Sequence, residues 1–219
     1  MIAEKLISKN LLPLHASDTG EEALGAMNDF HVKHLPVVED GRFLGILSEE
    51  EILEFGAEEP ISTYPLRHTG VFVRATDHLY DVLRLVGIHQ ITTIPVLQEN
   101  GAYLGLITLE DLLQAVAHLA SFAEPGGVLV LEMARHDYTM AEVARIVESE
   151  DAIILSSFLS AGEEPAQIEL TLKLNRQDLH RVIAALNRYG YEVKGSFTEK
   201  DYDETLKERY ELLMSYLNV

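Results

Sequence analysis

The chain has 219 residues, of which 47% are hydrophobic, so it can form two compact domains and is not a disordered protein. Its 36 acidic residues against 17 basic ones give a net charge of −19, and this field repels phosphate backbones, so we expect no DNA or RNA partner. The absence of cysteine excludes disulfides and thiolate metal sites, and no apolar stretch approaches the roughly 20 residues of a membrane helix, so we predict a cytoplasmic protein.

The first sixty residues predict three short strands and two helices. A strand at 11–16 precedes a polar stop and a helix whose apolar residues recur every three or four positions. Two apolar strands at 35–38 and 43–47 flank the glycine turn EDGR and form a hairpin, and Ser48 then begins the second helix. The predicted order is β-α-β-β-α.

Residues 61–122 repeat this unit. Leu35-Pro36-Val37 recurs as Ile94-Pro95-Val96 after 59 residues, and GRFLGILSEEEIL recurs as GAYLGLITLEDLL after 60. An offset that holds over about fifty residues indicates a duplicated supersecondary unit. One such unit leaves a sheet face uncovered, so we predict that the two copies pack sheet against sheet.

These paired motifs resemble the CBS domain pair, the family named after cystathionine β-synthase. The resemblance covers residues 1–122, with repeat one at about 1–60 and repeat two at about 61–122. It implies a regulatory module with two clefts between the repeats, in which adenosine-containing ligands such as AMP, ADP or ATP bind. In this family the segment Gly-hydrophobic-hydrophobic-Ser/Thr-x-x-Asp supplies a ribose-binding aspartate, and backbone beside the strand proline meets the adenine.

Carried over by position, the resemblance places the ribose of one cleft on Asp111 and Thr108, with Ile94 and Val96 beside the base. An ionised carboxylate can accept charge-assisted hydrogen bonds from both ribose hydroxyls. The counterparts in repeat one are four residues that we also assign to a ligand site: Ser48, Glu51, Leu35 and Val37.

The same motif also has a purely structural interpretation. Ser/Thr-x-x-Glu is the signature of a capping box, in which hydroxyl and acid satisfy exposed helix N–H groups. The capping box favours glutamate, whereas the ribose site of the family favours aspartate. We therefore expect a ligand at Asp111 and a cap at Glu51, with the opposite role left open for each.

A phosphate group requires cationic or N–H donors. The candidates are His31, Lys33 and His34 before the first strand proline, with His15, Arg74 and His89 elsewhere in the module, and Thr76 is also assigned to the ligand site. Histidine changes charge near neutral pH, but an ordinary solvated or core role remains the alternative for each. His31-x-x-His34 also has a metal-ligand spacing on a helix face, but no carboxylate or cysteine completes a set, so we predict no metal.

The second half predicts a separate domain. We assign 123–127 as a linker and 128–198 as a domain with the order βαββαβ, which is ferredoxin-like. Its first helix is expected to begin with a capping box formed by Thr139 and Glu142, and its second helix to begin at Asn175.

The second domain resembles the ACT domain, a regulatory module that binds amino acids or similar metabolites. The Asp-x-x-Pro-Gly turn of that family is replaced here by residues 134–138, so amino-acid binding is in doubt. A CBS pair followed by an ACT-like domain resembles the acetoin utilisation protein B group.

The C-terminal residues 199–219 predict an amphipathic helix. Its apolar positions fall three or four residues apart, at Tyr202, Leu206, Tyr210, Leu213 and Leu217. This stripe either docks onto its own domain or pairs with a second chain. We expect a homodimer.

The sequence contains no nucleophile motif and no glycine-rich phosphate loop, so we predict a protein that is not an enzyme and requires no cofactor. The first hypothesis is a sensor with an adenine nucleotide as regulatory ligand, which relays binding through the ACT-like domain to an unidentified protein partner. The alternative is a constitutive oligomerisation scaffold with degenerate clefts. A metal-dependent hydrolase built on the histidines ranks below both.

Overall fold

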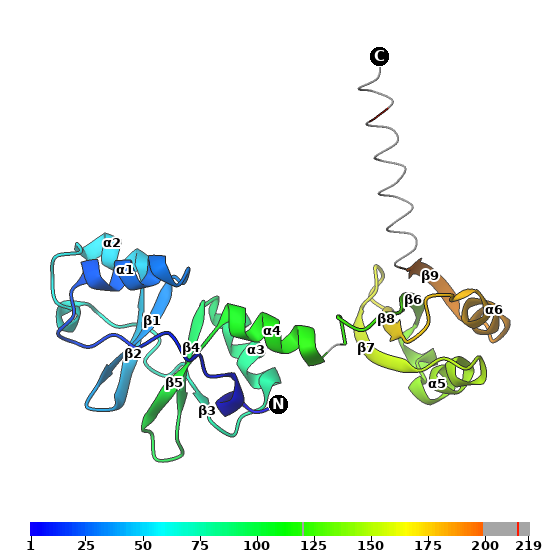
Figure 1. Ribbon diagram of the computed structural model, residues 1–219, viewed down its shortest axis with the longest axis horizontal. Coiled ribbons are helices and arrows are strands. Elements are labelled where there is room, and N and C mark those ends of the chain that lie inside the picture. The colour runs from blue at the N-terminus through cyan, green and yellow to red at the C-terminus, as the bar shows by residue number, and fades with distance from the viewer. Residues whose placement is uncertain (120, 199–213, 215–219) are drawn as a thin grey trace. The chain divides into compact units, whose positions relative to one another are not determined.

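The structure is a computed structural model that describes residues 1–119, 121–198 and 214 (Figure 1). The chain divides into two compact units, Met1–Val116 and a unit that begins at Ala117. The C-terminal helix predicted at 199–219 lies outside the described residues, apart from position 214. Within the described ranges, no helix is long and apolar enough to cross a membrane.

The first unit contains the two repeats, which share the succession helix, hairpin, helix; repeat two has a short additional strand before its first helix. Repeat one consists of η1 (Ala3–Leu6), α1 (Gly20–Asp29), β1 (His34–Glu39), β2 (Arg42–Ser48) and α2 (Glu49–Phe55). Repeat two consists of η2 (Ile61–Thr63), β3 (Val73–Arg74), α3 (Leu79–His89), β4 (Thr93–Leu97), β5 (Tyr103–Thr108) and α4 (Leu109–Leu119). The hairpins β1-β2 and β4-β5 are antiparallel, and β3 pairs parallel to β4.

The strand predicted at 11–16 is reduced to a single bridge between Leu14 and Val37. Pro13 has no N–H to extend the ladder. On the other side the N–H of His15 donates to Asp18 Oδ2 at 2.7 Å, which turns the chain toward α1. In repeat two the N–H of Arg74 makes the same bond to Asp77, and β3 is correspondingly only two residues long.

The segment that leads into each repeat crosses to the hairpin of the other repeat. The N–H of Ser8, near the start of repeat one, donates to the Leu106 carbonyl in β5 at 2.8 Å. The carbonyl of Arg67, near the start of repeat two, accepts from Ile46 N in β2 at 3.1 Å. Leu6 accordingly packs in the core of repeat two, and Leu106 packs in the core of repeat one.

The two repeats also meet where β1 and β4 begin. The N–H of Lys33 donates to Thr92 Oγ1 at 2.8 Å, and Thr93 Oγ1 donates to the His34 carbonyl at 2.7 Å. These residues are 59 positions apart, which is the repeat offset. Equivalent residues contact each other only beside a pseudo-twofold axis, so the axis of the duplication passes through this point.

The apolar residues of α4 are only partly covered. Leu112 is buried, but Leu109 is 46% exposed and Leu113 is 71% exposed. The apolar stripe of this helix is therefore wider than the surface that its own unit covers.

The second unit has the order βαββαβ, with β6 (Gly127–Ala134), η3 (Arg135–Asp137), α5 (Met140–Ser149), β7 (Ile154–Ala161), β8 (Gln167–Leu174), α6 (His180–Arg188) and β9 (Glu192–Phe197). The sheet is antiparallel with strand order β7-β8-β6-β9. The helices α5 and α6 cover one face of it (Figure 1). The alternate residues of β8 form the centre of this core, as predicted: Ile168, Leu170, Leu172 and Leu174.

One predicted cap and one predicted helix start in this unit are wrong. Thr139 is the N-cap residue of α5 as expected, but its side chain makes no cap hydrogen bond, and Glu142 Oε2 accepts from the Tyr191 hydroxyl at 3.0 Å. The helix predicted to begin at Asn175 begins at His180, since Asn175 Oδ1 instead accepts from Ile153 N at 2.8 Å.

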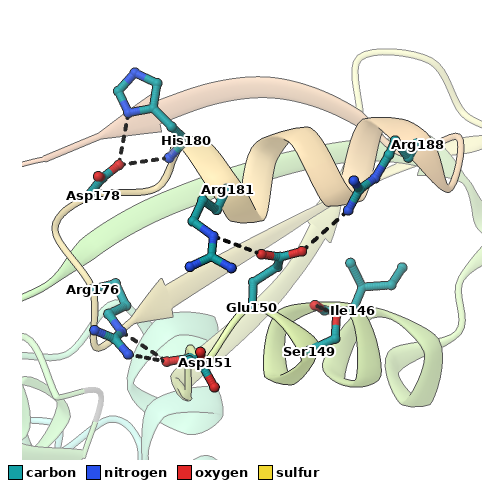
Figure 2. Close-up of polar contacts among 9 residues, drawn as sticks. All are labelled: Ile146, Ser149, Glu150, Asp151, Arg176, Asp178, His180, Arg181 and Arg188. Carbon is teal, nitrogen blue, oxygen red and sulfur yellow. Dashed lines mark hydrogen bonds and ion pairs between the residues drawn. The ribbon is translucent and has the colours of Figure 1, made fainter.

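The end of α5 is joined to α6 through one carboxylate. Figure 2 shows Glu150 between two arginines of α6, with Arg181 Nε at 3.2 Å and Arg188 Nη2 at 3.3 Å. Glu150 is mostly buried, whereas both arginines are exposed. Because both arginine partners lie largely in solvent, each pair adds only a modest stabilisation.

Candidate functional site

Asp111 lies at the start of α4 and closes a capping box with Thr108. Its Oδ2 accepts from Thr108 N at 3.0 Å and from the Thr108 hydroxyl at 2.7 Å, while Asp111 N donates to Thr108 Oγ1 at 3.1 Å. The residue is partly exposed. No ion pair or hydrogen bond to Asp111 Oδ1 occurs among the residues that the structure describes. This oxygen can therefore still accept from an incoming hydroxyl.

Glu51 makes the same box with Ser48 but has a different environment. Its Oε2 accepts from Ser48 N at 2.8 Å and from the Ser48 hydroxyl at 2.9 Å. The residue is only 2% exposed. Its Oε1 is buried, accepts no hydrogen bond from the described residues, and lies 3.1 Å from Arg67 Nε.

His34 lies beside the capping box of Ser48 and Glu51, because it pairs with Ser48 across the β1-β2 hairpin. Its Nδ1 accepts from Thr92 N at 3.2 Å, so this ring nitrogen carries no proton. Burial and the nearby His68 hold the His34 pKa below its usual value, although Glu50 and Glu51 act in the opposite direction. The neutral imidazole is therefore favoured.

Arg74 and Thr76 lie at the other end of β4 from Asp111. The register pairs Thr93 with Thr108 at one end of this strand, and Arg74 with Leu97 at the opposite end. Arg74 Nη1 and Thr76 Oγ1 both bind Glu99, at 2.8 and 3.2 Å. The structure therefore does not bring these two residues to the Asp111 carboxylate.

The four residues predicted to flank a base have fully buried side chains: Leu35, Val37, Ile94 and Val96. Their backbone is buried with them, so a base could reach these residues only if neighbouring groups moved.

The comparison with known families finds the same duplication. A family model described as the CBS domain matches twice, at residues 3–58 and 64–118, just over half of the chain. This chain belongs to the CBS domain family. The CBS domain pair is a regulatory module, and each match contains one hairpin and one capping box of the kind described above.

Several solved structures resemble the CBS pair of this chain. A CBS domain pair/ACT domain protein from Thermotoga maritima is 24% identical with a TM-score of 0.48, covering 54% of this chain and 98% of that one. A proposed acetoin utilization protein from Vibrio cholerae is 22% identical with a TM-score of 0.48, covering 57% and 96%. CBSX2 in complex with AMP is 19% identical with a TM-score of 0.45, covering 53% and 96%.

Longer proteins also contain the matching region. An inosine-5'-monophosphate dehydrogenase from Methanocaldococcus jannaschii is 22% identical over 157 residues, which make up 70% of this chain and 31% of the relative. This CBS chain thus spans about a third of the length of the first curated relative that it matches, and a quarter of the second.

The structure places Arg67, a residue that the sequence motifs do not single out, against the Glu51 carboxylate. Arg67 falls in an irregular segment with no motif. The repeat offset gave a usable signal, since it aligns Arg67 with Ser8 and so predicts two clefts with different walls.

The alternative interpretation of His31 and His34 as metal ligands on one helix face does not match the described part of the CBS pair. His31 follows the end of α1 and has a left-handed backbone, while His34 begins β1, so the two do not share a helix face. No group of three or more His, Asp or Glu side chains among the described residues is placed to hold a metal ion.

The second unit has a hollow of about 450 Å³ beside the turn at 134–138. It is lined by Glu132, Met133, Ala134, Asp137, Glu142, Gln167, Tyr189, Gly190, Tyr191 and Glu192. This lining contains four carboxylates and no lysine or arginine. The carboxylate of an amino acid would find no cationic partner there.

Proposed function

We propose that this protein is a non-enzymatic sensor that binds an adenosine-containing ligand in the cleft at Asp111. The observation that carries the proposal is the open carboxylate oxygen of Asp111, partly exposed and held rigidly by its own capping box. A ribose would donate its two hydroxyls to this group, and backbone beside Pro95 would meet the base.

Binding would act on the packing of the two repeats. The repeats are joined near the axis by the Lys33 to Thr92 and Thr93 to His34 hydrogen bonds. A ligand that contacts both repeats shifts their arrangement only if it binds one arrangement more tightly than another. We propose that the second unit, as an ACT-like domain, relays this shift to a protein partner, and that the chain acts as a homodimer.

The experiment is calorimetric titration of AMP, ADP and ATP into the full chain and into Asp111→Asn. The asparagine oxygen can still accept from Thr108, so the cap is kept while the charge that holds the ribose is lost. We expect a loss of affinity of tenfold or more in the variant, and little change in the matched variant Glu51→Gln. No heat from any of the nucleotides in the wild type would contradict the sensor.

A constitutive scaffold is the second candidate, and two observations favour it. Arg67 already occupies the carboxylate of the first cleft, and the hollow of the second unit has no cation for an acidic metabolite. A scaffold predicts the same oligomeric mass with and without nucleotide. A mass that changes on adding AMP would contradict it.

A further inference from the structure

We propose that Arg67 closes the first cleft from within, so that each chain binds one adenosine ligand, at Asp111, and not two. Arg67 would thereby determine which of the two duplicated clefts responds to ligand. The inference deepens the function proposed above and rests on it.

The contact of Arg67 with Glu51 leaves no acceptor for a ribose. Glu51 Oε2 already accepts twice from Ser48, and Oε1 is buried against the arginine at 3.1 Å. Arg67 Nη2 also lies 4.0 Å from Glu54, one turn further along α2. The guanidinium thus lies where the two ribose hydroxyls would have to donate.

The backbone fixes the start of the arginine side chain. Arg67 pairs with Ile46 in β2, and a side chain on Gly45 would meet the Leu66 Cβ at 2.9 Å. The segment therefore lies directly on the strand. Glu51 is almost fully buried and Arg67 is 64% exposed, so the pair adds a modest stabilisation while keeping a cation against the buried carboxylate.

The charged residues around Glu51 in the first cleft have uncharged counterparts in the second. By the repeat offset, Ser8 stands where Arg67 stands, Gln114 replaces Glu54, and Asp111 replaces Glu51. A second ion pair of the first cleft, Lys33 with Glu49 at 3.7 Å, is likewise replaced by Thr92 and Leu109. The positions in repeat two that are equivalent to Arg67 and Lys33 therefore hold no cation, and the salt bridges among the described residues include none to Asp111.

The test converts the first cleft into a copy of the second. The double variant Glu51→Asp with Arg67→Ser introduces the two residues found at the equivalent positions of repeat two, and it changes both partners of the ion pair together. We expect the wild-type full chain to titrate with one AMP per chain and the double variant with two. Adding Asp111→Asn to the double variant should return the value to one.

Two controls separate closure from general effects. Arg67→Lys keeps a cation beside Glu51, so the stoichiometry should stay at one. Glu150→Asp with Arg181→Ser makes the same chemical changes at an ion pair of the second unit, and it should also leave one site. Circular dichroism of each variant verifies folding before titration.

The outcomes distinguish the two proposals. Two sites in the wild type, or one site in a folded double variant, would overturn the closure by Arg67 while leaving the sensor standing. Binding only in the double variant would support closure and overturn the Asp111 sensor. No binding in either protein would overturn both.

Discussion

At the scale of single residues, His34 links the two repeats through its protonation state. Its Nδ1 accepts from Thr92 N, a bond that requires the neutral ring. Burial and His68 lower its pKa from the usual value of 6.5, while Glu50, Glu51 and Lys33 are the other charged groups that face it. A lowered histidine pKa means that the folded state binds fewer protons than the unfolded state near this pH.

We therefore expect stability to fall as the pH drops below about 6.5 and to stop falling below the folded-state pKa of His34. Above that window the contribution is fully present. The asparagine in His34→Asn can accept from Thr92 without titrating, so this part of the pH dependence should disappear. Thermal melts at pH 7.5 and pH 5 measure the effect, with the exposed His31→Asn as control. Equal pH dependence of both variants would contradict the assignment.

At the scale of elements, the close approach of residues 66–67 to β2 is the contact that shapes the first cleft. In Gly45→Ala the new Cβ would meet the Leu66 Cβ at 2.9 Å and the Arg67 carbonyl at 3.2 Å. Neither atom belongs to a flexible side-chain end, so the crossing segment has to shift.

We expect Gly45→Ala to lower the free energy of unfolding by about 1–3 kcal/mol, as overpacking does. Gly87→Ala, on α3 with open space around it, should instead raise it by about 0.5–1 kcal/mol through better helix propensity. Urea unfolding curves measure both changes. An unchanged free energy of unfolding in Gly45→Ala would show that residues 66–67 are not held against β2.

The sequence predicted the hairpins and the capping box at Glu51, because each depends on close neighbours in the chain, and it predicted the repeat from the 59-residue offset. At Asp111 the capping box was the alternative to the expected ligand. The sequence did not predict Arg67 beside Glu51, since that contact depends on a crossing segment with no periodic pattern. The missing cap at Thr139 has the same origin, because Tyr191 binds Glu142 from the far end of the unit. Local sequence patterns therefore located Glu51 and Asp111, whereas the contacts that distinguish them come from residues distant in the sequence.

At the scale of the whole molecule, α2 and α4 expose the same leucine in both repeats. Leu53 is 69% exposed and its counterpart Leu113 is 71% exposed. Apolar side chains that recur on equivalent helices indicate a covered surface, and a second copy of the chain would cover both.

We expect light scattering of the wild type to give twice the chain mass of 24.5 kDa. Leu113→Glu should shift the protein to the monomer, because it places a charge in the contact. Leu12→Glu, at an exposed leucine ahead of α1, should leave the dimer intact. A monomeric wild type would contradict the dimer.

The most direct measurement of the central claim is a crystal structure of the full chain grown with AMP. The account predicts one nucleotide per chain, with its ribose hydroxyls about 2.7 Å from the Asp111 carboxylate and with Arg67 still against Glu51. A nucleotide seated on Glu51 with Arg67 displaced, or an empty Asp111 cleft at saturating AMP, would contradict it.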